Sequence, residues 1–159
     1  MAGGQGLMAG KRGLILGVAN NRSIAYGIAK ACVDHGAEIA LTYQGEAFKK
    51  RVEPLAAELG AFVAGHCDVT DPASLDEVFA NVAKHWGKLD FLVHAIAFSD
   101  KDELTGRYVE TTRDNFLRTM DISVFSFTTI AKRAEALMTN GGSLLTLTYY
   151  GAEKVMPHY

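Results

Sequence analysis

The chain has 159 residues, of which 48% are hydrophobic and 21% charged, and these values are typical of a single folded domain. A formal net charge of −2 gives no reason to expect a nucleic-acid partner. Residues 1–13 contain no apolar signal-peptide core, and the longest apolar stretch, 91–98, is too short to span a bilayer. We therefore expect a cytoplasmic protein without membrane contact.

The two cysteines fall where a helix and a strand are predicted. We expect Cys32 and Cys67 to be buried, reduced thiols, which suits a cytoplasmic location. The sequence has no C-x-x-C and no H-x-x-x-H spacing. For this reason no metal site is predicted.

The first predicted unit consists of a strand, a tight loop and a helix. Residues 13–16 form a short apolar run, and residues 17–22 are polar and turn-like. Apolar residues then recur at helical spacing from Ser23 until Gly36. This arrangement directs the free N–H groups of a helix N-terminus past the end of a strand, where they stabilise an anion.

The loop of this unit differs from the usual dinucleotide fingerprint. G-x-G-x-x-G requires three glycines, and only Gly17 is present in the loop. Ser23 could cap the helix and donate its hydroxyl hydrogen to a phosphate. Gly27 is expected to let the helix lie close to the sheet. The alternative is an ordinary strand-to-helix turn with a serine cap, so this stretch alone leaves nucleotide binding open.

Strands and helices are predicted to alternate along the rest of the chain. The further strands are expected at 38–42, 61–67, 90–95 and 142–147, and the further helices at 46–59, 72–86 and 112–138. Pro54 is expected to disturb the middle of its helix, and Asp71 to cap the next one. The last helix is expected to turn five residues inward: Phe116, Met120, Phe127, Ala131 and Ala134. This alternation predicts an α/β fold, a Rossmann-like doubly wound parallel sheet with helices on both faces.

Ligands of such sheets bind beyond the carboxyl ends of the strands. Gln44 follows the second strand and can hydrogen-bond a ribose hydroxyl, and no Arg follows it to receive a 2′-phosphate, which favours NADH over NADPH. Asp68 and Val69 follow the third strand, where a carboxylate and a backbone N–H could meet an adenine ring. The alternatives are a solvated Gln44 and an Asp68 that only makes a turn. His94, at the end of the fourth strand, is expected to be packed and not catalytic.

Six segments together resemble one family. They are GVANNRSIAYGIA (17–29), TYQ (42–44), CDV (67–69), HAIAF (94–98), DISVFSF (121–127) and LLTLTYYGAEKVMPHY (144–159). They are similar to the bacterial NADH-dependent enoyl-[acyl-carrier-protein] reductases, a divergent branch of the short-chain dehydrogenase/reductase superfamily. Ordinary members of the superfamily carry T-G-x-x-x-G-x-G and N-A-G where this chain carries GVANNRS and HAIA.

The resemblance implies an NADH site, a contact with the acyl substrate and two active-site tyrosines. The residues that it assigns to the NADH site are Gly17, Ser23, Ile24, Gln44, Asp68, Val69 and Ile96. Ser99 corresponds to the substrate contact, and Tyr149 and Tyr159 correspond to the active-site tyrosines. The implied activity is reduction of a trans-2-enoyl thioester on acyl carrier protein, the last step of the fatty acid elongation cycle. The Tyr159 hydroxyl would then hydrogen-bond the thioester oxygen as negative charge develops there.

Tyr150 and Lys154 have the Y-x-x-x-K spacing of the ordinary superfamily. We do not assign catalysis to this pair, because Tyr150 comes directly after the fifth predicted strand, where ordinary members carry a serine. The family's catalytic tyrosine opens the next helix, and Tyr159 stands at that position.

Members of this family have about 260 residues, the size of one domain, and are usually homotetramers. They also place a catalytic lysine seven residues after the tyrosine. We therefore expect residues 1–159 to be the N-terminal part of one NAD-binding domain, without that lysine, the catalytic helix and the last strands. Two alternatives are a non-catalytic nucleotide-binding protein and a short-chain reductase that acts on a ketone. The two tyrosines and the missing N-A-G disfavour them.

Overall fold

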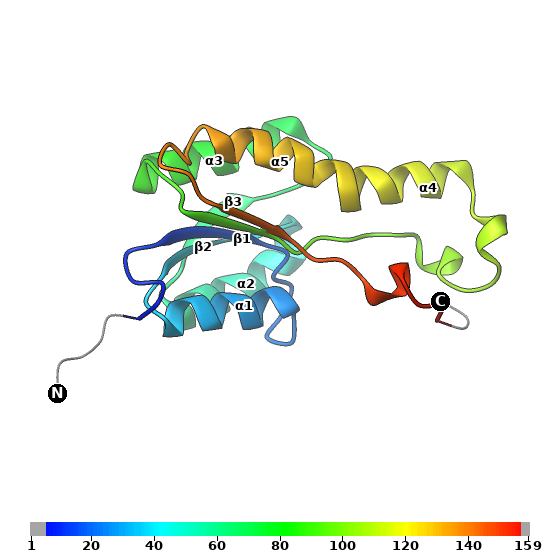
Figure 1. The fold of residues 1–159 in the computed structure, drawn as a ribbon, viewed down its shortest axis with the longest axis horizontal. Coiled ribbons are helices and arrows are strands. Elements are labelled where there is room, and N and C mark those ends of the chain that lie inside the picture. The colour runs from blue at the N-terminus through cyan, green and yellow to red at the C-terminus, as the bar shows by residue number, and fades with distance from the viewer. Residues whose placement is uncertain (1–5, 157–159) are drawn as a thin grey trace.

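The computed structural model describes residues 6–156. At its centre lies a parallel five-stranded sheet with the order β3-β2-β1-β4-β5 (Figure 1). The strands are β1 (Arg12–Leu16), β2 (Glu38–Tyr43), β3 (Phe62–His66), β4 (Phe91–His94) and β5 (Ser143–Thr146). The first strand is therefore the middle one, with two strands on each side of it.

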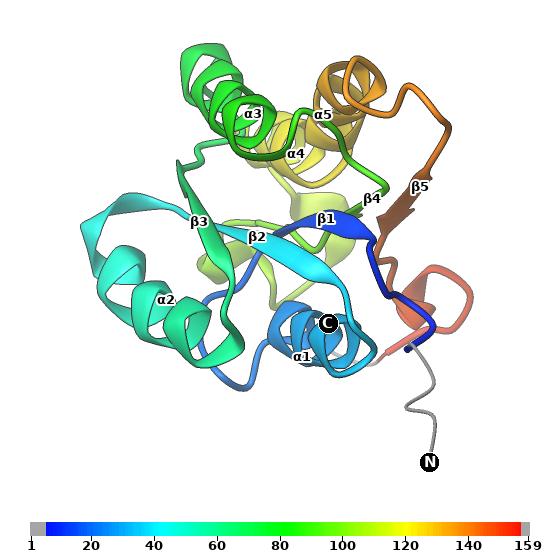
Figure 2. The same cartoon turned by 90° about the vertical axis from the view of Figure 1, so that its left-hand side faces the viewer.

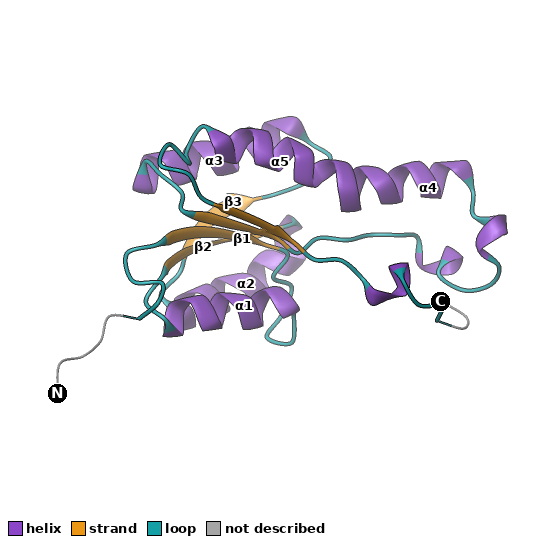
Figure 3. Cartoon of the chain, viewed as in Figure 1, coloured by secondary structure: helices purple, strands orange, loops and turns teal. Residues whose placement is uncertain are grey.

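Helices cover both faces of this sheet (Figure 2). One face carries α1 (Ile24–Asp34) and α2 (Gly45–Leu59). The opposite face carries α3 (Pro72–Trp86) and α5 (Ser126–Glu135), and α4 (Arg113–Met120) precedes α5 and extends past the end of the sheet (Figure 3). Short 3₁₀ turns lie at Lys101–Glu103, Tyr108–Glu110 and Tyr150–Ala152. The predicted Rossmann-like doubly wound α/β fold is confirmed.

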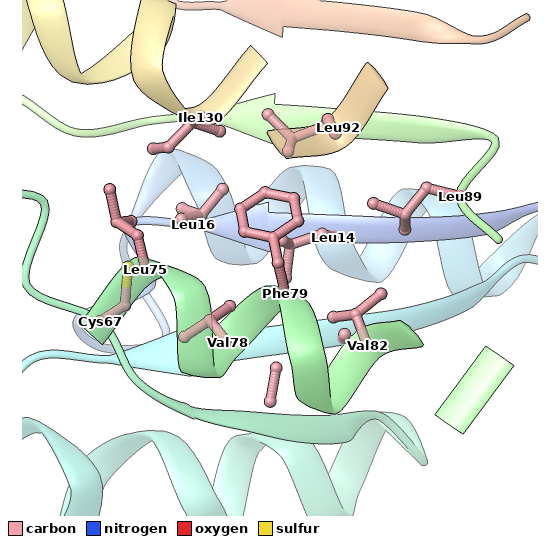
Figure 4. Packing of buried hydrophobic residues seen from close by; sticks show 13 residues of the cluster. Leu14, Leu16, Cys67, Leu75, Val78, Phe79, Val82, Leu89, Leu92 and Ile130 are labelled. Atoms are coloured by element: carbon pink, nitrogen blue, oxygen red, sulfur yellow. The ribbon is translucent and has the colours of Figure 1, made fainter. Parts of the chain in front are cut away.

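Each face of the sheet has its own hydrophobic core, because successive side chains of a strand point to opposite faces. On β1, Leu14 and Leu16 belong to the core beneath α3 and α5, as Figure 4 shows. Ile15 belongs to the core beneath α1 and α2. The apolar stripe predicted for 72–86 is confirmed, since Leu75, Val78, Phe79 and Val82 are all buried.

Ile130 of α5 is completely buried in the core of Figure 4. Replacing it with Ala is expected to lower the free energy of unfolding by about 3 kcal/mol, because apolar contacts are lost and a cavity remains. Urea denaturation measures this change. Ile24→Ala is the matched control, because Ile24 is 69% exposed and its truncation should change stability little. Equal losses in the two variants would contradict the assignment of Ile130 to the core.

The predicted ends of α2 and α3 are confirmed, but the role predicted for Gly27 within α1 is wrong. The Asp71 side chain accepts a hydrogen bond from the Ala73 N–H at 3.0 Å, as predicted for the cap of α3. α2 ends at Leu59 with Gly60 as its C-cap. The helix is continuous through Pro54, so the disturbance expected there does not interrupt it. Gly27 is wrong as a point of close approach, because a Cβ there would meet open space. α1 lies against the sheet through Ala25 and Ala29 instead.

The long helix predicted over 112–138 contains an irregularity. A π turn (Asp121–Phe125) separates α4 from α5. The extra residue of a π turn shifts the helical phase, so residues before and after it do not share one apolar stripe. The expected inward positions of Phe116 and Met120 are wrong, because these side chains are 46% and 41% exposed. Ala134 is buried as predicted, and Phe127 and Ala131 are half-buried.

β5 forms one edge of the sheet. It pairs with β4 on one side, and all four of its residues are exposed.

None of the helices within residues 6–156 combines the length and the apolar character needed to cross a membrane.

Candidate cofactor-binding cleft

A cleft of about 760 Å³ lies at the carboxyl ends of the strands. Its wall comes from the loop after β1, from the ends of β2, β3 and β4, and from α4 and the π turn. Five of the seven residues assigned to the NADH site line this cleft: Gly17, Gln44, Asp68, Val69 and Ile96. Strand ends that are far apart in the sequence thus meet at one surface, as expected for a doubly wound sheet.

The loop after β1 is shaped by a close backbone approach. Gly17 has φ of 100°, and a Cβ at this position would collide with the carbonyl oxygen of Ala95. Both facts require glycine here. The single glycine of the loop therefore lets the β1 and β4 ends meet at the floor of the cleft.

Ser23 organises the same loop in a way that differs from the prediction. Its hydroxyl oxygen accepts hydrogen bonds from the N–H groups of Ala19 and Asn20, both at 3.0 Å. Its side chain makes no cap bond to α1, so the expected serine cap is wrong. The first-turn N–H groups of α1 are left without this cap, which suits binding of an anion at the helix N-terminus. Ser23 and Ile24 are not among the residues that line the cleft, and Ile24 is exposed.

Gln44 and Asp68 meet across the ends of β2 and β3. The Gln44 Nε2 donates a hydrogen bond to Asp68 Oδ2 at 3.3 Å. Asp68 Oδ1 accepts from both the N–H and the hydroxyl of Thr70, at 2.9 and 2.7 Å. Partial burial acts to raise the pKa of Asp68, but these hydrogen bonds from Thr70 and Gln44 and the nearby His66 hold it below its ordinary value. Asp68 is therefore an ionised acceptor that makes a turn, and its contact with an adenine ring stays a prediction.

Replacing Asp68 with Asn is expected to reduce the pH dependence of stability. A carboxyl group whose pKa is lowered on folding adds stability above its unfolded value of 3.8, and this contribution is lost as pH falls through the folded pKa. The difference in unfolding free energy between wild type and Asp68→Asn should be fully present above the unfolded pKa of 3.8 and should disappear as pH falls through the lower pKa of the folded state. Urea denaturation across this range measures it. A difference that stays constant with pH would contradict the assignment.

The third wall follows β4. Ala95, Ile96, Ala97 and Phe98 line the cleft as a small apolar segment. Ser123 of the π turn holds this segment, because its hydroxyl accepts from the Phe98 N–H at 3.0 Å and donates to the Phe98 carbonyl at 3.1 Å. His94 is 1% exposed, and burial lowers the pKa of its imidazole. The prediction that His94 is packed is confirmed.

Ser99 lies beside the cleft in a polar network. Its hydroxyl is hydrogen-bonded to the Asn115 side chain and lies 3.0 Å from the Thr119 hydroxyl. Asn115 is 3% exposed, and it also accepts from the Asp100 N–H and donates to Glu103. The network fixes the segment 99–112 on α4. Ser99 is not among the residues that line the cleft, and its contact with an acyl substrate stays a prediction.

Tyr149 follows β5 and is 49% exposed, and Tyr150 opens the next 3₁₀ turn and is 67% exposed. Tyr159 lies outside the described residues.

The sequence did not reveal that Phe48, Arg118 and Ile122 also line the cleft. Arg118 donates to both carboxylate oxygens of Asp100 at 2.8 and 2.9 Å. The sequence did not predict a role for Arg118 at the cleft, because it lies on α4, which extends past the end of the sheet, and no local pattern marks that face.

Both cysteines are free thiols; Cys67 is buried and Cys32 is half-buried, so full burial of Cys32 is not observed. Burial raises the pKa of Cys67, which lines the cleft, to about 11, so its thiol is protonated near neutral pH. Among residues 6–156, no three His, Cys, Asp or Glu side chains gather closely enough to hold a metal ion.

Comparisons with known proteins agree with this geometry. The chain is 74% identical over its whole length to "Enoyl-[acyl-carrier-protein] reductase [NADH] 1" of Rhizobium meliloti, and it spans 58% of that relative. A crystal structure of the reductase from Anaplasma phagocytophilum in complex with NAD matches with a TM-score of 0.91 and 62% identity, over 96% of this chain and 58% of that one. The reductase from Aquifex aeolicus matches with a TM-score of 0.93 and 44% identity, over 97% and 62%.

A family model also matches most of the chain. The model described as "Enoyl-(Acyl carrier protein) reductase" covers residues 17–159, from the glycine of the first loop onward. The matched region begins directly after β1 and includes β2, β3, β4 and β5. The chain belongs to the enoyl-(acyl carrier protein) reductase family.

Proposed function

We propose that this chain is the NADH-binding part of an enoyl-[acyl-carrier-protein] reductase, and that residues 1–159 belong to one domain. The observation that carries the proposal is the meeting of Gly17, Gln44 and Asp68 at one cleft. The chain spans about 58% of the length of its relatives, so the complete activity is proposed for the full-length protein.

The residues of the cleft fit a dinucleotide. The absence of a side chain at Gly17 and the uncapped start of α1 favour a pyrophosphate, and the Ser23 hydroxyl can donate to it. Gln44 would bind a ribose hydroxyl, and the ionised Asp68 would accept from the adenine amino group. The Val69 N–H would reach the adenine ring, Ile24 would adjoin the pyrophosphate, and Ile96 would lie along the cofactor.

A bound reduced nicotinamide would supply a hydride to the β-carbon of a trans-2-enoyl thioester, and protonation of the α-carbon would complete the reduction of the double bond. The Tyr159 hydroxyl would donate a hydrogen bond to the thioester oxygen as negative charge develops there. Tyr149 would adjoin the reacting group from the end of β5, and Ser99 would contact the acyl chain. The residues therefore divide into a cofactor set on β1 to β4 and a substrate set that includes both tyrosines.

The proposal includes the partners of the full-length protein. Acyl carrier protein would deliver the substrate, and neither nucleic acid nor a membrane is needed for the reaction. We propose a homotetramer in the cytoplasm, in line with the family resemblance.

The test is NADH oxidation by the full-length protein with crotonyl thioester, with a small ketone as the competing substrate. We expect turnover with the thioester, none with the ketone, and a lower rate with NADPH than with NADH. Turnover with the ketone alone would favour another short-chain reductase. NADH binding without turnover of either substrate would favour a non-catalytic nucleotide-binding protein.

A further inference from the structure

We infer that His94 is a positioning residue that joins the cofactor wall of the cleft to the segment that carries Tyr149. This inference rests on the proposed function. It begins from an unusual position: His94 is the last residue of β4 and is 1% exposed, where a parallel strand normally carries an apolar side chain. A buried imidazole in a sheet needs hydrogen-bond partners.

His94 has two such partners on two other elements. Its Nε2 lies 2.7 Å from the hydroxyl of Ser126, at the start of α5, and Ser126 is itself 1% exposed. Its Nδ1 lies 3.2 Å from the hydroxyl of Thr146, the last residue of β5. The ring also packs edge-on against Phe127, with 5.5 Å between ring centroids. Three elements are thus connected through one side chain.

The direction of each hydrogen bond follows from Ser126. Its hydroxyl donates to the Ile122 carbonyl at 2.7 Å, so its single hydrogen is already used. The Ser126 oxygen must therefore accept from His94, which places the imidazole hydrogen on Nε2. Nδ1 then carries the lone pair and accepts from the Thr146 hydroxyl. A neutral imidazole in one tautomer satisfies both partners.

His94 and Ser126 are connected to residues that line the cleft, and Thr146 leads to Tyr149. Ala95 and Ile96 follow His94 directly and line the cofactor wall. Ile122, which accepts from Ser126, lines the opposite wall in the π turn. Tyr149 stands three residues after Thr146. The bond between His94 and Thr146 therefore sets where the tyrosine segment leaves the sheet relative to the cofactor wall.

The main-chain pairing between β4 and β5 is weak next to the bond between His94 and Thr146. The Leu147 N–H donates to the His94 carbonyl at 3.3 Å, a long hydrogen bond at the place where β5 leaves β4. The side-chain bond to Thr146 is thus a second attachment at the position where the main-chain pairing ends.

The test uses four variants of the full-length protein. Thr146→Val removes the donor to Nδ1 and keeps the shape of the side chain. His94→Asn places an amide oxygen near the position of Nδ1 and can restore the bond to Thr146. His94→Gln places its amide near the position of Nε2 and can restore only the bond to Ser126. Thr139→Val is the matched control, because Thr139 is exposed before β5, at the end of that strand away from the cleft.

Kinetics with NADH and crotonyl thioester, together with NADH affinity and thermal unfolding, give the readouts. Thr146→Val and His94→Gln are expected to lower kcat about tenfold, because a misplaced active-site group raises the barrier. Their Kd for NADH should stay within about twofold of wild type, since the cofactor residues on β1 to β3 are untouched. His94→Asn should recover most of kcat, and Thr139→Val should match wild type.

Three outcomes would overturn the inference. The first is a normal kcat for Thr146→Val, whatever its thermal stability, which would mean that His94 only stabilises the fold. The second is an equal loss of kcat in His94→Asn and His94→Gln. Should both histidine variants fail to fold, Thr146→Val and its control still decide. The third is a wild-type protein that does not reduce the thioester, which would overturn the proposed function and this inference with it.

Discussion

Replacing Tyr159 with Phe in the full-length protein is expected to lower kcat for a trans-2-enoyl thioester by about a hundredfold or more. The reason is that hydride addition puts negative charge on the thioester oxygen, and a positioned hydroxyl stabilises that charge only as it develops. The affinity for NADH should stay nearly unchanged, because the cofactor residues of the cleft lie on β1 to β4. Stopped-flow or steady-state NADH oxidation measures kcat.

The matched control for this variant is Tyr150→Phe. Tyr150 has the Y-x-x-x-K spacing with Lys154 but is 67% exposed at the start of a 3₁₀ turn. We expect Tyr150→Phe to retain wild-type kcat. A hundredfold loss of kcat in Tyr150→Phe together with a normal rate in Tyr159→Phe would assign the catalytic role to Tyr150 and Lys154 and would contradict a catalytic role for Tyr159.

A polypeptide of residues 1–159 alone is expected to bind NADH weakly and to show no turnover of crotonyl thioester. In it β5 keeps an exposed edge, with Leu144 and Leu145 40% and 45% accessible to solvent. The relatives that it matches are considerably longer, since the chain spans 58% of two of them. Mixing NADH, thioester and the polypeptide and following absorbance at the reduced nicotinamide band gives the test. Measurable turnover by this polypeptide would show that residues 1–159 contain a complete active site.

The sequence predicted the strand and helix alternation because each element carries its own local signal. The stripe on α3 between Asp71 and Gly87 and the apolar run of β1 are of this kind. The meeting of Gln44 and Asp68 could also be expected, since both directly follow parallel strands and such strand ends lie at one edge. The cleft residues that were predicted share this property.

The parts that were not predicted depend on contacts between distant residues or on phase. The apolar spacing predicted one regular helix with Phe116 and Met120 on its inward face. The π turn adds a residue after them and shifts the helical phase, and both side chains are exposed. The Asn115 network joins α4 to the segment 99–112 through side chains that carry no periodic signal. Ser23 stands at the expected cap position, but its hydroxyl oxygen accepts hydrogen bonds from the N–H groups of the preceding loop and not from those of α1.

The strand order has a consequence for synthesis of the chain on the ribosome. β2 and β3 can join β1 in the order in which they are made, but the other edge of β1 must wait for β4. The Arg12 N–H, for example, bonds to the Asp90 carboxylate 78 residues later. At about 5–20 residues per second, this edge of the nascent chain stays unpaired for roughly 4–16 s. An apolar strand with one open edge can pair with other chains during that time, so the interval is when nascent-chain chaperones would matter most.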